Sequence, residues 1–125
     1  MLTKVGKVLR QIRLNNDEVL RDMAYKLNVS AAFLSAIENG KKKMSQKLKE
    51  RIIAKYKLSE DEANQLDMAI VETEDFIKIN TKKSSNLQKE LAISFARSFE
   101  SLNDEEVKTL MDYIDRIKLE ESYNE

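Results

Sequence analysis

The side chains of this sequence that could do chemistry are carboxylates, amines and hydroxyls, because the chain contains no Cys and no His. It therefore has no thiolate nucleophile, no Cys-based zinc site and no imidazole to act as general base or metal ligand. The densest carboxylates, Asp104-Glu105-Glu106 with Asp112 and Asp115, lack the glycine loop and ordered ligand spacing of a calcium site. Helix capping and the helix dipole explain an acidic first turn. We expect no enzyme, no metal and no cofactor.

The amines are concentrated in the first half of the chain, where Lys41-Lys42-Lys43 forms a basic loop. The 22 Lys and Arg balance the 22 Asp and Glu, so the net charge is zero. Residues 1–58 carry 14 basic and 5 acidic side chains, a net of +9, whereas residues 59–125 carry 8 and 17, a net of −9. Such asymmetry indicates a nucleic-acid or membrane partner for the basic half, or simply two halves that attract each other.

The composition favours an all-α chain that does not enter a membrane. There is no Pro and only two Gly, whereas Lys, Glu, Leu and Ala are plentiful. The longest apolar runs are a few residues, too short to span a bilayer, and the N-terminus does not resemble a signal peptide. We expect a cytoplasmic protein with no membrane partner.

Helical spacing of apolar residues predicts five helices in the first 74 residues. The first covers residues 3–14, and the second follows the Asn15-Asn16-Asp17 cluster. Ser30 is expected to cap the third helix, which Gly40 ends. Ser45 is expected to cap the fourth helix, and Ser59 with Glu62 forms a capping box for the fifth. The predicted inward positions are Val5, Val8, Leu9, Ile12, Leu20, Met23, Ala24, Leu27, Phe33, Leu34, Ile37, Leu48, Ile52, Ile53, Tyr56, Leu66, Ala69 and Ile70.

The second part of the chain begins with a change of pattern. Alternation at Asp75–Asn80 predicts a short strand, which would need a partner, or else an extended linker. The polar segment 81–86 indicates a linker. Two helices then form a C-terminal hairpin, the second capped by Asn103 and Glu106. We therefore divide the chain into a domain at 1–74, a linker or short strand at 75–85 and a hairpin at 86–125.

The hairpin carries two apolar stripes, which we interpret as core rather than as a cofactor site. Two short helices cannot bury two apolar faces by themselves, so the stripes must pack on the first domain or on a second subunit. Dimerisation is the favoured interpretation, since a two-fold dimer fits palindromic DNA sites. The expected dimerisation residues are Leu87, Leu91, Phe95 and Phe99 in one stripe and Val107, Leu110, Met111, Ile114 and Ile117 in the other.

The second and third predicted helices, with their short connection, follow the helix-turn-helix pattern. The small Ala24 allows close helix packing, the turn is Asn28-Val29-Ser30, and Leu34 and Ile37 point inward. In this geometry the second helix of the pair projects far enough to enter a major groove about 12 Å wide.

Residues 9–58 resemble the Cro/repressor-type, or Xre-like, helix-turn-helix regulators. The resemblance rests on Leu9-Arg10-Gln11-Ile12-Arg13, on Met23-Ala24-x-x-Leu27-x-Val29-Ser30 and on Phe33-Leu34-Ser35-x-Ile37-Glu38-Asn39-Gly40-Lys41. More narrowly, the chain looks like a group of such regulators in Gram-positive bacteria and their phages. The tail Leu91–Phe99 is similar to the tail of that group, although more loosely.

The resemblance implies a five-helix repressor-like domain and gives roles to matching positions. Arg13 and Glu38 match a partly buried ion pair that joins the first helix to the end of the third. Side chains that read base edges match Ala31, Ala32, Ser35 and Ala36, while phosphate contacts match Asn39, Lys41 and Lys43. We add Arg10, Lys42 and Ser30, the last because it caps the helix that would face the groove.

Two departures from the family pattern change these expectations. Val19-Leu20 stands where many members have Ser or Thr followed by Gln, so Asn16 or Asp17 is expected to cap the second helix instead. The three alanines can touch a thymine methyl but cannot form bidentate hydrogen bonds. Specificity would then come from Ser30 and Ser35, from Phe33 if exposed, from DNA shape or from dimer spacing. Core packing is the favoured role of Phe33.

These observations predict a sequence-specific double-stranded DNA-binding transcriptional regulator that acts as a repressor, with the helix at 30–38 in the major groove. The alternative is a protein-interaction module on the same scaffold, an antitoxin or a phage-borne inhibitor of a host defence protein. In that case the basic face or the acidic C-terminal half would bind a protein partner.

Overall fold

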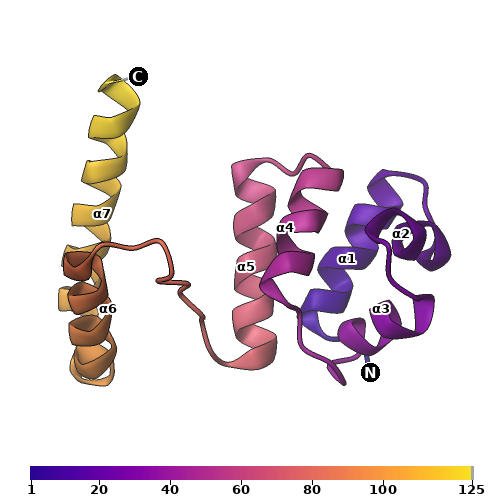
Figure 1. Ribbon diagram of the computed structural model, residues 1–125, viewed down its shortest axis with the longest axis horizontal. Coiled ribbons are helices and arrows are strands. Elements are labelled where there is room, and N and C mark those ends of the chain that lie inside the picture. The colour runs from indigo at the N-terminus through magenta and orange to yellow at the C-terminus, as the bar shows by residue number, and fades with distance from the viewer. Residues whose placement is uncertain (125) are drawn as a thin grey trace. The chain divides into compact units, whose positions relative to one another are not determined.

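The computed structural model describes residues 1–124 and is entirely helical (Figure 1). The α-helices are α1 (Lys4–Asn15), α2 (Leu20–Leu27), α3 (Ala31–Glu38), α4 (Gln46–Lys55), α5 (Glu60–Glu74), α6 (Asn86–Ser98) and α7 (Asp104–Asn124). A single 3₁₀ turn, η1 (Phe99–Ser101), follows α6 directly. The all-α expectation is confirmed. Within residues 1–124, no helix combines the length and the apolar character needed to cross a bilayer.

The chain divides into two compact units. The N-terminal unit comprises Met1–Lys78, and the C-terminal unit begins at Ile79. The division falls inside the segment 75–85 that the sequence marks as a linker. The helices α1 to α5 form the first unit, and α6 and α7 form the second (Figure 1).

Side-chain caps begin most of the helices. The Oγ atoms of Ser30 and Ser45 accept from the N–H groups of Phe33 and Leu48, at 3.0 and 3.1 Å. Ser59 and Glu62 form the expected capping box, and so do Asn103 and Glu106 at α7. Two caps were not predicted from the sequence: the Thr3 hydroxyl accepts from Gly6 N–H, and Ser85 forms a capping box with Gln88. Each cap satisfies N–H groups that a helix leaves unpaired at its start.

The expected cap of α2 is wrong. Asn16 instead ends α1, where its side-chain amide donates to Ile12 O at 2.8 Å. Asp17 takes the left-handed conformation, with φ of 55°, and so turns the chain. Val19 occupies the N-cap position, and its N–H donates to Asp22 Oδ2 at 2.9 Å. The Asp22 carboxylate thus supplies the half of a capping box that pairs the N-cap N–H, while no side chain among residues 1–124 accepts from the Asp22 N–H.

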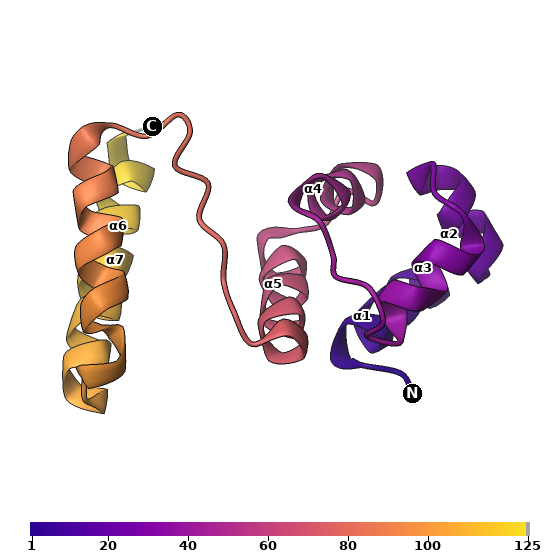
Figure 2. The ribbon, with the colours of Figure 1, turned by 60° about the horizontal axis from the view of Figure 1, so that its bottom comes forward.

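The core of the N-terminal unit gathers apolar side chains from all five helices and from the loop before α4. Figure 2 shows α1 to α5 arranged around this interior. The buried set is Val5, Leu9, Ile12, Met23, Ala24, Leu27, Leu34, Ile37, Met44, Leu48, Ile52, Leu66 and Ala69. Val8, Leu20, Ile53, Tyr56 and Ile70, also expected inside, are partly buried against it.

Phe33 was predicted to pack in the core, and this is wrong. Its side chain is 37% exposed, whereas Leu34 and Ile37 are almost completely buried. Because Leu34 and Ile37 lie three residues apart on one helix face, they define the inward side of α3. Phe33 lies about 100° away from Leu34 around the helix and therefore reaches the edge of the core.

The segment after α5 is an extended linker and not a strand, since residues 1–124 contain no strand at all. A strand is stable only when it pairs with other strands and packs on an apolar face, and this segment has no such partner among residues 1–124. The Phe76 ring is instead held by two lysines, whose Nζ atoms lie 4.5 Å (Lys43) and 5.3 Å (Lys78) from its centre. Contacts of this kind are the favourable pairing of an ammonium with an aromatic face.

A buried ion pair fixes the end of α3 to α1. Arg13 Nη1 donates to Glu38 Oε2, and Nη2 donates to Oε1 at 3.1 Å. The two residues are only 6% and 4% exposed. The N–H and the hydroxyl of Thr3 both donate to the Glu38 carbonyl, at 3.0 and 2.8 Å. A Cβ on Gly6 would lie 2.5 Å from this carbonyl, so the close approach of the two helices requires glycine there.

We expect Glu38→Leu to lower the free energy of unfolding by about 3–5 kcal/mol, because it leaves the Arg13 guanidinium buried without a carboxylate. The double variant Arg13→Met/Glu38→Leu should recover most of that loss, since it removes both charges and keeps the volume apolar. Urea unfolding followed by far-ultraviolet circular dichroism measures both. Glu50→Leu, at an exposed glutamate of α4, is the control and should change stability little. A double variant no more stable than Glu38→Leu would contradict the prediction.

Candidate functional site

The outward side of α3 presents a row of small side chains. Ala31 and Ala32 are exposed, and Ser35 and Ala36, one turn later, are half-buried. Residues four apart share a helix face, so the four positions form one continuous strip. The strip faces away from Leu34 and Ile37, which anchor α3 in the core. Nothing bulky therefore prevents another molecule from approaching the backbone of α3 closely.

The turn before α3 sets the direction in which that strip faces. Asn28 takes the left-handed conformation with φ of 58°, and Val29 N–H donates to Ala24 O at 3.0 Å. Ala24 is 3% exposed, so its small side chain lies at the helix contact, as the sequence analysis expected. Ser30 then caps α3 while remaining exposed. The N-terminus of α3, with its partial positive charge, is consequently accessible from solvent.

The basic loop is attached to the other end of α3. The N–H groups of Lys41 and Lys42 both donate to Ala36 O, at 2.8 and 3.2 Å. Gly40 makes this turn with φ of 78°. All three lysine side chains are exposed. The loop thus places three ammonium groups directly beyond the alanine strip.

Asn39 and Ser35, both expected to contact nucleic acid, hydrogen-bond to each other. The Asn39 side-chain amide donates to Ser35 O at 2.9 Å and to Ser35 Oγ at 3.3 Å. The Asn39 carbonyl oxygen and the Ser35 hydroxyl proton take no part in these bonds. Ser35 is therefore the only polar side chain of the four-residue strip, and its hydroxyl oxygen already accepts from Asn39.

Lys43 differs from its neighbours because the linker holds it. Its ammonium lies over the Phe76 ring, and the next residue, Met44, donates its N–H to Glu74 Oε2 at 3.2 Å. This connection was not predicted from the sequence. Residues 43 and 76 are 33 positions apart, and no local pattern links them.

Arg10 lies on the side of α1 that faces α3. Gly6 approaches the Glu38 carbonyl and Arg13 binds the Glu38 carboxylate, so both residues mark this side. Arg10 follows Gly6 by four positions and precedes Arg13 by three, which places it on the same face. Its side chain is exposed. Helical spacing thus puts the exposed Arg10 on the same face of α1 as Gly6 and Arg13.

A second polar cluster, missed by the sequence analysis, joins α2 and α4 to the loop after α1. Glu18 accepts from Lys26 Nζ at 2.6 Å and from the Tyr56 hydroxyl at 2.5 Å. Burial raises the pKa of Glu18, but the hydrogen bonds from Lys26 and Tyr56 outweigh it, so the pKa lies below its ordinary value. Burial and the Glu18 carboxylate raise the pKa of the Tyr56 hydroxyl well above its ordinary value. The carboxyl therefore stays ionised and serves as a structural acceptor.

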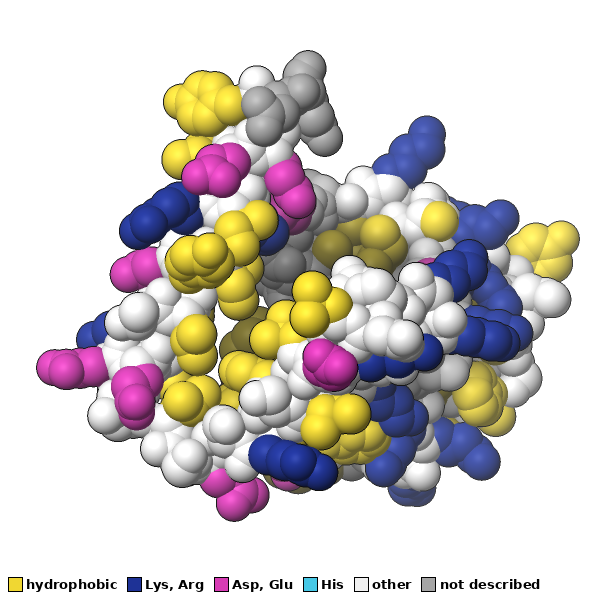
Figure 3. Space-filling model, turned by 60° about the vertical axis from the view of Figure 1, so that its left-hand side comes forward, with side chains coloured by type: hydrophobic (Ala, Val, Ile, Leu, Met, Phe, Trp, Pro, Cys, Tyr) yellow, Lys and Arg dark blue, Asp and Glu magenta, His cyan; other side chains and the backbone are white. Residues whose placement is uncertain are grey.

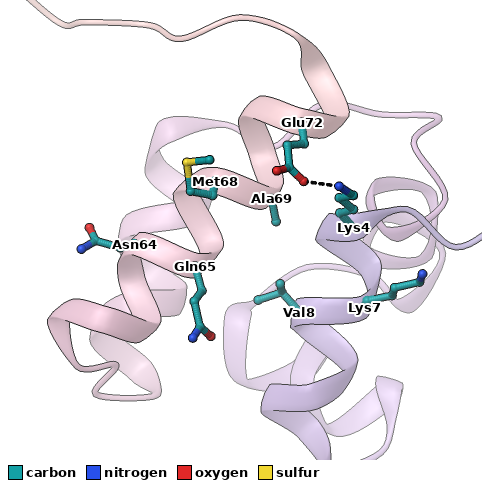
Figure 4. A pocket seen from close by; sticks show the side chains of 8 residues that line it. All are labelled: Lys4, Lys7, Val8, Asn64, Gln65, Met68, Ala69 and Glu72. Carbon is teal, nitrogen blue, oxygen red and sulfur yellow. Dashed lines mark ion pairs between the residues drawn. The ribbon is translucent and has the colours of Figure 1, made fainter. Parts of the chain in front are cut away.

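A shallow groove of about 460 Å³ lies on the surface where α1 packs against α5 (Figure 4). Its only ion pair among the residues drawn joins Lys4 Nζ to Glu72 Oε2 at 2.5 Å. The other lining residues are Lys7, Val8, Asn64, Gln65, Met68 and Ala69. In the part of the chain that the structure describes, no group of three or more carboxylates could hold a metal ion. The groove thus presents apolar surface beside the Lys4–Glu72 ion pair.

The hairpin places α6 and α7 side by side and antiparallel (Figures 1 and 2). In the single chain both apolar stripes are exposed, with Val107 alone half-buried among them. Leu87 is 76% exposed, Leu91 69% and Ile114 57%. In Figure 3, hydrophobic side chains are visible along the hairpin, while Lys and Arg gather on the N-terminal unit. Neither hairpin helix has a buried side chain among its described residues.

Comparisons with known proteins give no relative for the chain: no protein-family model, no curated protein and no solved structure matches it.

We expect Ser30→Ala to lower the free energy of unfolding by about 1 kcal/mol, because the Phe33 N–H loses its acceptor at the start of α3. Ser30→Asp should retain stability, since a carboxylate at an N-cap accepts the same hydrogen bond. Urea unfolding compares the two variants with the wild type. Equal stabilities of Ser30→Ala and Ser30→Asp would show that the cap contributes nothing.

Proposed function

We propose that the N-terminal unit binds double-stranded DNA and reads the major groove with α3, so that the protein regulates transcription as a repressor. One observation carries the proposal. The strip of small side chains on α3 is followed directly by the basic loop, and the N–H groups of Lys41 and Lys42 in that loop donate to Ala36 O of α3. A smooth helix face and a fixed cluster of cations therefore form one continuous surface.

The dimensions of the strip suit a groove. The major groove is about 12 Å wide and admits a single α-helix. Alanines at positions 31, 32 and 36 allow the α3 backbone to approach the base pairs closely, and their methyl groups can contact thymine methyls. The Ser35 hydroxyl and the exposed Phe33 ring are the remaining groups that could distinguish sequences.

The charges around the strip suit phosphates. Lys41 and Lys42 extend from the loop, Arg10 lies on the neighbouring face of α1, and the capped N-terminus of α3 adds a partial positive charge. Phosphate contacts of this kind fix the register of a protein on the duplex without specifying sequence. Contacts of the strip with the bases would then determine which DNA sequence is preferred.

Affinity should fall with salt. If about six phosphates are neutralised, log K plotted against log salt should have a slope of about −5. Lys41→Ala and Lys43→Ala should weaken binding to all sequences alike and each reduce the slope by about 1. Lys108→Ala, at an exposed lysine of α7, is the matched control and should leave the slope unchanged. A wild-type slope near zero would overturn the proposal.

Changes in the strip should alter sequence preference instead. Ala32→Gln introduces a carboxamide that can bind adenine through two hydrogen bonds, a contact worth about 1–3 kcal/mol of discrimination. Selection from a random DNA library should therefore yield a different sequence for Ala32→Gln than for the wild type, whereas Lys41→Ala should select the wild-type sequence. Identical sequences for Ala32→Gln and the wild type would show that α3 does not read bases. A reporter gene placed behind the selected site tests the regulatory role: the wild type should repress it, and Lys41→Ala should repress it less.

A second function is favoured by the exposed Phe33, because this ring and the neighbouring alanines form an apolar rather than a hydrogen-bonding surface. Such a surface suits a protein partner, as for an antitoxin or an inhibitor of a defence protein. Purification of the tagged protein from a host lysate separates the two functions. A stoichiometric protein partner without enriched DNA would favour the second.

A further inference from the structure

Each helix of the C-terminal hairpin exposes a row of large apolar side chains. On α7, residues 107, 110, 111, 114 and 117 lie within a 120° sector, as the 100° turn per residue requires. On α6, residues 87, 91, 95 and 99 follow each other at intervals of four, and the Phe95 and Phe99 rings contact edge to face at 5.6 Å. We call these nine residues the hairpin stripes. Eight of them are at least 42% exposed.

The exposed area is close to what a stable interface needs. Taking about 150 Å² for each side chain, the lower end of the aromatic range because six of the eight are aliphatic, the fractional exposures amount to roughly 700 Å² per hairpin. A standard protein interface buries about 800 Å² on each partner. A two-helix hairpin without a buried side chain lacks a core of its own, so covering the stripes would supply one.

We propose that the hairpin stripes pair with those of a second copy of this chain, forming a four-helix bundle with two-fold symmetry. An identical hairpin offers stripes of matching length on two antiparallel helices, which is the geometry that four-helix bundles bury. In such an interface the same surface serves both partners. Charge does not oppose the pairing, because residues 79–125 carry 7 basic and 10 acidic side chains in mixed order.

The pairing goes beyond the proposed DNA binding and does not depend on it, although the two are compatible. Residues 79–85 join the N-terminal unit to α6, and seven extended residues span at most about 25 Å, or about 50 Å for the two linkers of a dimer. Major grooves on one face of a duplex repeat about every 34 Å. The segment is therefore long enough for two N-terminal units joined at their hairpins to reach successive grooves.

The test is the mass of the full-length chain in solution without DNA, measured by sedimentation equilibrium at micromolar concentration. The wild type should show twice the 14.5 kDa of one chain. Ile114→Glu should weaken association on the order of 100-fold or more, because each dimer would bury two unpaired carboxylates. Leu119→Glu is the matched control: Leu119 is 59% exposed, against 57% for Ile114, but lies on another side of α7. It should remain dimeric.

A monomeric wild type would overturn the proposal, whether the stripes are then covered by the N-terminal unit or by another protein. Equal dissociation of Ile114→Glu and Leu119→Glu would overturn it as well. If Ile114→Glu does not fold, Leu91→Asn on α6 makes the same comparison. The Lys41→Ala/Lys43→Ala variant separates this proposal from the proposed function, because it should lose DNA affinity and keep the dimer mass.

Discussion

The buried contact between Arg13 and Glu38 determines where α3 lies, and the candidate site depends on that position. The guanidinium binds both carboxylate oxygens, while Thr3 donates twice to the carbonyl of the same glutamate. The closeness of α1 and α3 at Gly6 completes this attachment. Because removing either charge alone leaves the other buried and unpaired, the pair tolerates little variation. It fixes the end of α3 from which the basic loop extends.

The remainder of the site follows from this attachment. With Leu34 and Ile37 buried, the alanine strip must face solvent, and the loop bonded to Ala36 must lie beside it. The linker then adds a connection of its own, since Phe76 holds Lys43 and Glu74 accepts from Met44 N–H. The segment that leads to the hairpin thus touches the loop that we propose binds phosphate. Any displacement of Phe76 would change the surroundings of one of its three ammonium groups.

Zero net charge gives a misleading impression of this molecule. The sum cancels a basic N-terminal half against an acidic C-terminal half, and each half has its own structural role. The basic half contains the alanine strip and the loop, whereas the acidic half contains the whole hairpin with its exposed stripes. Acidic residues repel DNA phosphates, which favours a contact of the hairpin with protein rather than with the duplex.

Local chemistry explains what the sequence determined by itself. Apolar spacing located the helices, and hydroxyl or amide caps at Ser30, Ser45, Ser59 and Asn103 marked their starts, because both signals act over a few residues. Most of the failures are tertiary. The contacts of Phe76 with Lys43 and of Tyr56 with Glu18 depend on residues distant in sequence, whereas the start of α2 is a local bond from Val19 to Asp22 that a hydroxyl or amide cap does not mark. The hairpin stripes are exposed in the single chain. The spacing of apolar residues predicts that a helix has an apolar face, but it does not predict which surface covers that face.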